Sequence, residues 1–172
     1  MSVKDALELF GKRIQQQSKS NLTKKGKKDK GDLYNSIGYE VKVSKNSFQL
    51  SFTMEDYGLF IDKGVKGKTS STKAPNSPFK FGTGTGKKGG LTEGINGWVK
   101  RKRIQFKARG SGKFLSYKST AFLISRSIYN KGLETTNFFT KPFENEFKKL
   151  PSEIVEAYGL EVNKLMIDIF KK

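Results

Sequence analysis

Few side chains in this sequence are of a type that catalyses reactions or binds metals. The 172 residues include no His and no Cys. His is the commonest general base and metal ligand, while Cys supplies thiol nucleophiles and zinc ligands. Chemistry that needs either residue is therefore excluded, and an enzyme would depend on carboxylates, Lys, Tyr or Ser.

The acidic residues do not form a recognisable catalytic or metal-binding pattern. Hydrolysis by paired carboxylates would have to use Glu55, Asp56, Asp62 and Glu93. Asp56 and Asp62 flank an apolar segment, where capping and surface charge are sufficient roles. None of these four candidates belongs to a D-x-D or E-x-x-E cluster of the kind that favours a carboxylate metal site. We expect no catalytic residues and no bound metal.

One glycine pattern resembles a nucleotide-binding motif. Gly84, Gly86 and Gly89 have the spacing G-x-G-x-x-G. A dinucleotide site needs this pattern between a buried strand and a helix within a βαβ unit. Here it lies in a loop rich in Gly, Thr and Lys. We expect no cofactor, and the sequence predicts a non-enzymatic binding or structural protein.

The net charge of +18 is concentrated in two stretches. Residues 63–113 hold 14 Lys and Arg against one acidic residue, and residues 19–31 hold six Lys against one. Together these stretches account for the whole net charge. Both are rich in Gly, Ser and Thr, so they are predicted to be flexible basic insertions in one domain that covers residues 1–172.

Such basic stretches have more than one interpretation. They could neutralise the phosphates of a nucleic acid, remain as solvated loops, or pack on an acidic neighbouring subunit. Whether the stretch 63–113 contacts DNA or protein stays open at this point. The cations predicted to contact a polyanion or a partner are Lys24, Lys25, Lys27, Lys28, Lys87, Lys88, Lys100, Arg101, Lys102 and Arg103.

The first element that supports these stretches is an amphipathic helix predicted over residues 2–18. Its apolar residues recur at spacings of four, three and four, namely Val3, Leu7, Phe10 and Ile14. Ser2 is the predicted N-cap, with Asp5 completing a capping box. The helix is expected to end in the Lys- and Gly-rich stretch 24–31.

A short helical turn and a β-hairpin are predicted next. Asp32 is expected to cap the turn, whose apolar residues are Leu33 and Ile37. The hairpin would turn at Lys45-Asn46. Its two strands carry one apolar face each, formed by Tyr39, Val41 and Val43 and by Phe48, Leu50 and Phe52.

The middle of the chain is predicted to be mostly irregular. Residues 57–64 fit either a short helix ended by Gly64 or a third strand. Residues 65–97 contain most of the remaining turn-forming residues, and 95–107 fit a short basic helix or strand. A helix is predicted over 115–131, followed by Gly132. Its inward residues are expected to be Leu115, Phe122, Ile124 and Ile128.

The C-terminal region is predicted to be a second amphipathic helix. Thr140 is the expected cap, Pro142 lies in the first turn, and Pro151 kinks or restarts the helix. Its apolar face would continue through Ile154, Tyr158, Leu165 and Ile169. The N-terminal and C-terminal helices would pack on the dry face of a small antiparallel sheet, giving an α+β fold with a long basic Gly-rich loop.

No apolar run approaches the length of a membrane span, and we expect neither a membrane helix nor a signal peptide. We therefore expect a cytoplasmic or intracellular product with no membrane partner.

Three motifs, in this order, resemble those of one protein family. The first is Gly31-Asp32-Leu33-Tyr34-Asn35-Ser36-Ile37, after the N-terminal helix and before the hairpin. The second is Tyr57-Gly58-Leu59-Phe60-Ile61-Asp62-Lys63-Gly64, and the third is Lys141-Pro142-Phe143. They resemble the "T-G-x-L-x-x-S-I", "Y-A-x-Y-V-E-x-G" and "P-F-L" segments of the neck or tail-completion proteins of tailed bacteriophages. This family is also called head–tail joining or minor tail proteins.

The matches to this family can be followed residue by residue. Gly31 matches the glycine of the first motif. Tyr57, Asp62 and Gly64 match the second motif, with Gly58 in place of Ala and Asp62 in place of Glu. Pro142 and Phe143 match the third, with Glu144 where Leu is usual.

The resemblance implies a non-enzymatic virion protein that forms a homo-oligomeric ring between the portal side of the capsid and the tail. Its implied partners are other copies of itself and the adjacent portal-side adaptor and tail proteins. The genome passing through the lumen is a further candidate partner. Location in the virion, after assembly in the host cytoplasm, follows. The aromatic residues expected in the core or at a subunit interface are Tyr57, Phe60, Trp98, Phe143 and Phe147. For each of them core packing is the simpler interpretation.

A basic nucleic-acid-binding protein, nucleoid-like or ribosome-associated, is the alternative function. A carboxylate nuclease that uses Asp56 or Asp62 with a metal ion is a third hypothesis.

Overall fold

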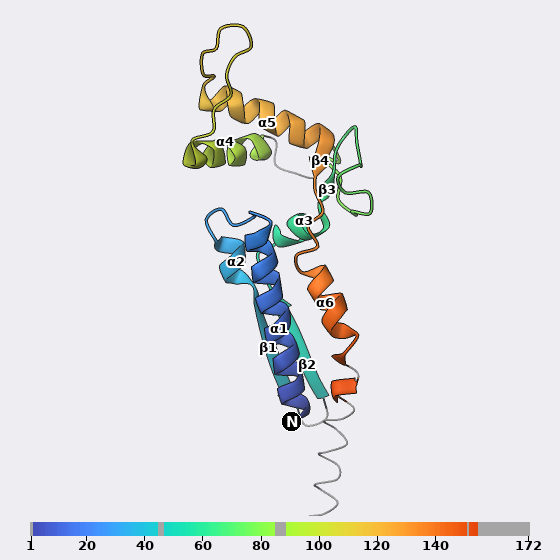
Figure 1. Ribbon diagram of the computed structural model, residues 1–172. Coiled ribbons are helices and arrows are strands. Elements are labelled where there is room, and N and C mark those ends of the chain that lie inside the picture. Colours follow the sequence, from blue (N-terminus) through green and yellow to red (C-terminus); the bar gives the residue numbers. More distant parts are fainter. Residues whose placement is uncertain (1, 45–46, 85–88, 151, 155–172) are drawn as a thin grey trace, which may run out of the picture. The chain divides into compact units, whose positions relative to one another are not determined.

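The computed structural model describes residues 2–44, 47–84, 89–150 and 152–154. Contacts within the chain group it into two compact units, whereas the sequence predicts one domain. Unit 1 comprises Met1–Gly58 together with Asn137–Lys172, and unit 2 comprises Leu59–Thr136. In the described residues, each unit combines helices with a two-stranded antiparallel sheet, which confirms the α+β class (Figure 1).

Unit 1 begins with helix α1, Val3–Lys24, whose predicted apolar face is buried. The Ser2 hydroxyl accepts a hydrogen bond from the Asp5 N–H, and the Asp5 carboxylate accepts one from the Ser2 N–H, so the capping box is confirmed. The prediction that residues 19–31 form a loop is wrong for their first part. Ser18 and Leu22 are buried and extend the i, i+4 pattern of the helix.

Helix α2, Asp32–Ser36, is the predicted short turn, with Leu33 and Ile37 buried. Its N-cap residue is Gly31 and not Asp32, which lies in the first turn. Gly31 has a φ of 96°, a left-handed conformation that glycine adopts without strain. The backbone geometry of this glycine, and not a carboxylate cap, therefore starts the helix.

The predicted hairpin is confirmed as strands β1, Gly38–Ser44, and β2, Ser47–Thr53. The register places Val41 opposite Leu50, so the apolar residues of both strands share one face. The turn at Lys45-Asn46 lies outside the described residues.

Helices α1 and α6 lie along the hairpin in unit 1 (Figure 1). Aromatic rings from these three elements fill the core of the unit. The ring centroid of Phe143 on α6 lies 5.9 Å from that of Phe10 and 6.0 Å from that of Phe52. Both pairs meet edge to face, an arrangement that aromatic rings favour. The packing of an N-terminal and a C-terminal helix on the dry face of the sheet is confirmed for α1 and α6.

Helix α6, Thr140–Phe147, differs from the prediction at its start. Phe139 occupies the N-cap position without a side-chain cap, and Thr140 is already helical. Pro142 is buried in the first turn, as predicted. Ile154 packs against the core. The rest of the predicted C-terminal helix, including Pro151, Tyr158, Leu165 and Ile169, lies outside the described residues.

Unit 2 begins in helix α3, Gly58–Lys63, so the segment 57–64 supplies a helix and not a third strand. Gly64, with a φ of 70°, follows it as predicted. Strand β3, Val65–Lys66, then pairs with β4, Gly132–Leu133.

Hydrogen bonds hold much of the segment that was expected to be a flexible loop. The Lys66 N–H donates to the Phe79 carbonyl at 2.8 Å, and the Ser77 hydroxyl donates to the Gly64 carbonyl at 2.7 Å. Ala74 is fully buried. Composition does not reveal this backbone pairing, because the partners lie apart along the chain.

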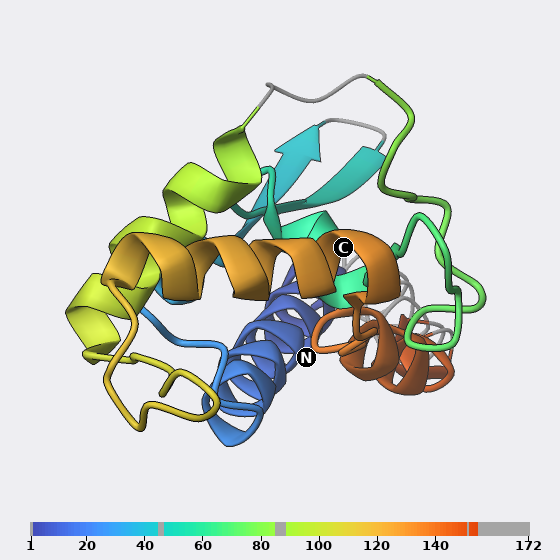
Figure 2. The same ribbon diagram turned by 90° about the horizontal axis from the view of Figure 1, so that it is seen from above.

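Helices α4, Gly90–Lys102, and α5, Tyr117–Lys131, pack across one another (Figure 2). The segment 95–107 is therefore largely helical, and its helix begins before the predicted start. Gly132, with a φ of 83°, ends α5 as predicted.

The predicted inward position of Phe122 on α5 is wrong, since this residue is exposed. Leu115, Ile124 and Ile128 are only partly buried. The buried residues of α5 are small, namely Thr120, Ala121 and Ser125. Small side chains let another element approach closely, so the large ones are left on the outer face.

Candidate polyanion and partner surfaces

The densest group of predicted contact residues lies at the C-terminal end of α4. Lys100, Arg101 and Lys102 occupy its last turn, and Arg103 caps it with a φ of 53°. All four side chains are exposed. Cations at this end of the helix also interact favourably with the negative end of the helix dipole. The structure thus brings the four together as one group, which we call the α4 cluster.

Residues 104–116, which connect α4 to α5, form a short ribbon. An antiparallel bridge joins Lys107 to Phe114. Next to it the Ala108 N–H donates to the Lys113 carbonyl at 2.8 Å. This segment, called the ribbon below, therefore presents its side chains from a paired backbone.

The base of the ribbon is fixed to itself and to α5. The Leu115 N–H donates to the Phe106 carbonyl, and the Gln105 side-chain amide donates to the Leu115 carbonyl, both at 2.8 Å. The Phe106 N–H donates to the hydroxyl of Thr120, a buried residue of α5, at 3.2 Å. The direction in which the ribbon leaves the helix pair is set by these bonds.

Three exposed cations lie between two exposed aromatic residues in the sequence of the ribbon. Lys107, Arg109 and Lys113 are exposed, as are Phe106 and Phe114. The Lys107 ammonium lies 5.3 Å from the centroid of the Phe114 ring, within the range of a cation–π interaction.

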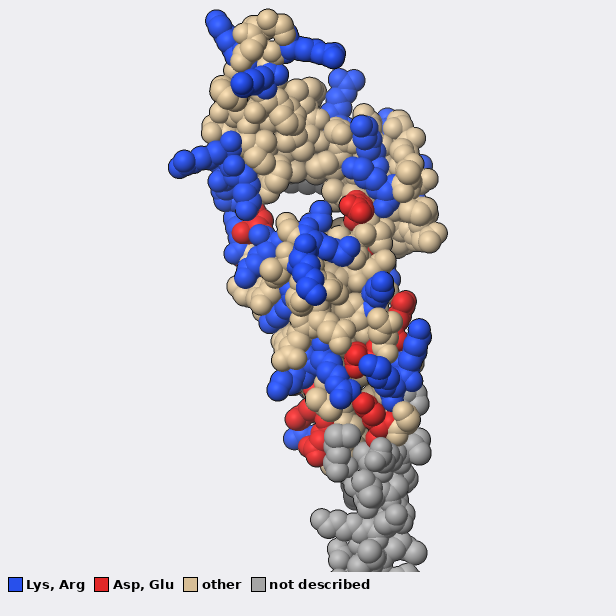
Figure 3. Space-filling model, in the orientation of Figure 1, with Lys and Arg blue, Asp and Glu red and all other residues tan. Residues whose placement is uncertain are grey.

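The part of the sequence that holds the α4 cluster and the ribbon carries positive charges only. Residues 94–133 contain ten Lys and Arg and no Asp or Glu. Unit 2 as a whole holds 17 basic and three acidic residues, which gives +14 of the total +18. Lys and Arg side chains project from α4, α5 and the ribbon on the face seen in Figure 3.

The predicted contact residues of unit 1 have a different environment. Lys24, Lys25, Lys27 and Lys28, called the α1 lysines below, are exposed where α1 ends. The Lys28 ammonium lies 4.0 Å from the centroid of the Tyr34 ring. Part of this charge is therefore engaged within the unit.

The other predicted cations, Lys87 and Lys88, lie outside the described residues. The same is true of Gly86 in the glycine motif. Gly89 has a φ of 80° and precedes α4, but the described strands are antiparallel and form no βαβ unit.

The aromatic residues predicted for the core or a subunit interface differ in burial, some being half-buried and others exposed. Phe143 is half-buried in the aromatic core, and Trp98 on α4 is half-buried. Phe147 is 52% exposed and stacks on Phe143 at 5.7 Å between ring centroids. Phe60 is exposed, although its ring meets that of Phe79 at 4.5 Å.

Tyr57 joins the first two motifs. The residue as a whole is 42% exposed, but its hydroxyl is hydrogen-bonded with the backbone of Leu33. Partial burial raises the pKa of Tyr57, and this outweighs the opposite effect of that hydrogen bond. The side chain therefore anchors α2 to the segment after the hairpin.

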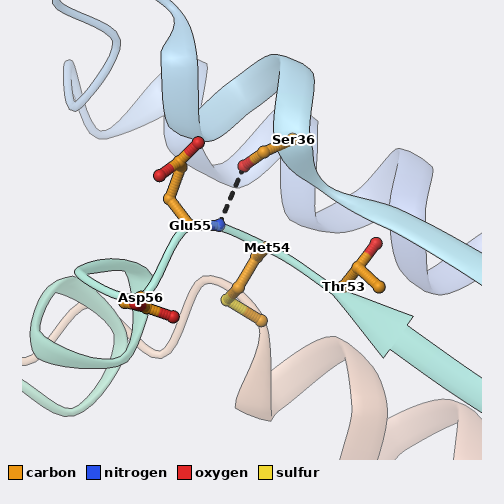
Figure 4. Close-up of a pocket in the computed structure, with 5 residues that line it drawn as sticks. All are labelled: Ser36, Thr53, Met54, Glu55 and Asp56. Atoms are coloured by element: carbon orange, nitrogen blue, oxygen red, sulfur yellow. Dashed lines mark hydrogen bonds between the residues drawn. The ribbon is translucent and has the colours of Figure 1, made fainter.

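The candidate carboxylates are not arranged as a catalytic pair. Glu55 and Asp56 border a shallow hollow, where the Glu55 N–H donates to the Ser36 hydroxyl at 3.0 Å, and their carboxylates point in different directions (Figure 4). Asp62 and Glu93 lie on different helices of unit 2. Among the described residues, no group of three or more acidic side chains could hold a metal ion.

Sequence reasoning counted the ribbon cations only as part of a flexible stretch. Lys107, Arg109 and Lys113 were not predicted as contact residues, because no local sequence pattern predicts the backbone pairing that forms the ribbon. The absence of acidic residues from 94 to 133 is the signal that could have pointed to this part of the chain.

Comparison with protein-family models, with curated proteins and with solved structures found no significant match. None of the described helices has the length and apolar character needed to span a bilayer.

Proposed function

We propose that this chain is a structural subunit of the neck of a tailed bacteriophage. In this proposal, copies of the chain form a homo-oligomeric ring that completes or joins the tail and contacts portal-side adaptor and tail proteins. The proposal involves no catalysis and places the protein in the virion after assembly in the host cytoplasm.

The positions of the motif residues in unit 1 support this proposal. Gly31 starts α2 with its left-handed backbone, and Tyr57 is tied to Leu33 of the same helix. Phe143 lies in the aromatic core between α6 and the hairpin. Of the residues that carry the family resemblance, Gly31, Tyr57 and Phe143 thus hold elements of unit 1 together.

The observation that carries the proposal is the open sheet of unit 1. Within the described residues, β1 and β2 pair only with each other. Both outer edges of the sheet therefore present backbone groups that another strand could bond. At the hairpin tip, the cross-strand pair Val43 and Phe48 is 51% and 47% exposed. A neighbouring copy that covers this edge and tip would repeat the same contact around a ring.

Native mass spectrometry and negative-stain electron microscopy of the purified protein test this proposal. We expect a closed ring for the wild type. Phe48→Glu should release subunits, because it puts a charge on the exposed apolar face. Gln49→Glu is the matched control, since it adds the same charge to the opposite face of the same strand and should leave the ring intact. A wild type that stays monomeric at high micromolar concentration would contradict the proposal.

A basic nucleic-acid-binding protein remains the second candidate, because the run from 94 to 133 has no acidic residue. This candidate predicts tight, steeply salt-dependent binding of free DNA or RNA by a protein that forms no ring. Native mass spectrometry in the absence of nucleic acid separates the two functions.

A further inference from the structure

We propose that the ribbon and the α4 cluster bind the phosphate backbone of double-stranded DNA without reading its sequence. This inference rests on the proposed function in one respect, namely that a ring in the neck surrounds the path of a duplex genome. The surface itself is defined by unit 2 alone.

The first step is electrostatic. The α4 cluster and the three ribbon cations place seven positive side chains within residues 100–113, in a run that contains no carboxylate from 94 to 133. Each phosphate that such cations neutralise releases counterions, which favours binding. This run of the chain also contributes no carboxylate that would repel phosphates.

The second step is the geometry of the ribbon. Paired backbone from Lys107 to Phe114 and the anchor on Thr120 hold Lys107, Arg109 and Lys113 on an ordered element. Less conformational entropy is lost on binding when the contact residues are already positioned. The major groove of B-DNA is wide enough to admit a two-stranded ribbon.

The third step is the tip of the ribbon, which consists of Gly110, Ser111 and Gly112. Gly110 and Gly112 have φ values of 97° and 66°, and a Cβ on either would meet no atom within 4 Å. The tip is therefore narrow and open. These three residues offer no amide side chain and no large side chain with which to distinguish bases, and we assign the flanking Arg109 and Lys113 to phosphates.

The aromatic rings of the ribbon favour duplex DNA over single-stranded nucleic acid as the ligand. Stacking of unpaired bases needs accessible aromatic faces. The Lys107 ammonium already lies over the Phe114 ring at 5.3 Å, which leaves Phe106 as the other exposed ring of the ribbon. The cations outnumber the exposed rings on this segment.

The experiment measures binding of a short labelled duplex of mixed sequence, and of its single strand, by fluorescence anisotropy at several salt concentrations. The ribbon variant K107Q/R109Q/K113Q removes three charges. The variant K24Q/K25Q/K27Q removes the same number from the α1 lysines and is the matched control. Circular dichroism and the melting temperature check that both variants are folded.

We expect the ribbon variant to weaken duplex binding about tenfold or more. The slope of log K against log salt should fall in magnitude by about 2–3, since each lost phosphate contact contributes about 0.9. The control should change the affinity by about twofold or less. The variant K107R/R109K/K113R keeps all three charges and should retain duplex binding. This result would show that substitution at these three positions does not by itself unfold the ribbon.

Three results would overturn the inference. An equal loss in the control would mean that net charge alone drives binding. Tighter binding of the single strand would exclude the duplex. Displacement of the duplex by poly-L-glutamate of equal charge would indicate an acidic protein partner. Native mass spectrometry of the ribbon variant keeps the two proposals distinct, since loss of DNA binding with an intact ring affects only this inference.

Discussion

Units 1 and 2 of this protein bury different kinds of side chain. The interior of unit 1 is formed mainly by large apolar residues, including Phe10, Ile14, Leu22, Leu33 and Phe138. The buried apolar residues of unit 2 are smaller, namely Val65, Ala74, Val99 and Ala121. Unit 2 also buries Asp62, Ser77, Thr120, Ser125 and Thr136. Unit 1 therefore depends on apolar packing and unit 2 more on hydrogen bonds and close backbone approach.

The same contrast holds at the surface. Unit 2 carries most of the net charge and exposes Phe106, Phe114, Phe122 and Leu123. Large apolar side chains that are exposed on a unit can contact a partner molecule. The comparison points to a division in which unit 1 supplies a stable scaffold with the proposed ring contact at its open sheet, and unit 2 displays the cationic contact residues.

The largest expected effect is on aromatic packing in unit 1. Phe143→Ala should lower the free energy of unfolding by about 3–4 kcal/mol, because it leaves a cavity beside the rings of Phe10 and Phe52. Phe122→Ala makes the same change on the exposed face of α5 and should cost about 0.5 kcal/mol or less. Urea unfolding followed by circular dichroism measures both. Equal losses would contradict the contrast between the units.

A smaller effect is expected from backbone geometry in unit 2. Gly132→Ala should destabilise this unit by about 2–3 kcal/mol, because the residue has a φ of 83° and its Cβ would meet the Val65 carbonyl oxygen. Gly110→Ala, at a φ of 97° in open space, isolates the conformational strain and should cost about half as much or less. Hydrogen exchange should show the loss of protection in residues 59–136 and little change in α1. Similar losses for both variants would exclude the close approach as the cause.

The third prediction concerns the buried carboxylate of unit 1. Burial raises the pKa of Glu146, but Gln17, Lys149 and Arg13 together outweigh burial and lower the pKa below its ordinary value of 4.5. A lowered folded-state pKa stabilises the fold above the ordinary pKa, and this stabilisation is lost as the pH falls through the folded-state pKa. Glu146→Gln should therefore cost about 1–2 kcal/mol at neutral pH.

Measurements of stability at acidic pH provide the control for the Glu146 prediction. The difference in stability between wild type and Glu146→Gln should narrow as the pH is lowered below 4.5. Glu144→Gln, an exposed position on the same helix, should have a smaller effect at neutral pH. Denaturant unfolding at several pH values measures these differences, and a difference that does not narrow with pH would contradict the assignment.

The smallest expected effect concerns the contribution of the α4 cluster to the stability of the fold. K100Q/R101Q/K102Q removes cations that favour the end of the helix dipole, and it should cost about 0.5–1 kcal/mol in low salt and less in high salt. Thermal unfolding at two salt concentrations is sufficient. A loss comparable to that of Phe143→Ala would assign these cations a structural role and weaken the distinction between the two units.

Much of unit 1 could be predicted from local patterns. The capping box of Ser2 and Asp5 depends only on residues three apart, and the buried face of α1 follows the period of a helix. The alternation of apolar residues gave both strands of the hairpin. The caps of α2 and α6 were predicted wrongly, because Gly31 and Phe139 take the cap positions through backbone geometry that side-chain type does not reveal.

The candidate surface could be predicted only in part. The α4 cluster is contiguous in the sequence, so its members had to lie together. The ribbon was missed, because pairing between Lys107 and Phe114 depends on a turn and on an anchor at Thr120. The position of Phe122 was predicted wrongly for a related reason, since the small residues of α5 form the buried side.

The sequence by itself determined α1, α2 and the hairpin, the net charge and the absence of His and Cys chemistry, because these depend on composition and on spacing along a helix or strand. The tertiary structure decided which large side chains are buried, which glycine-rich segments are ordered and which cations share a surface. These outcomes depend on contacts between residues far apart in the chain. Val65 with Leu133 and Phe10 with Phe143 are examples, and no local pattern encodes such contacts.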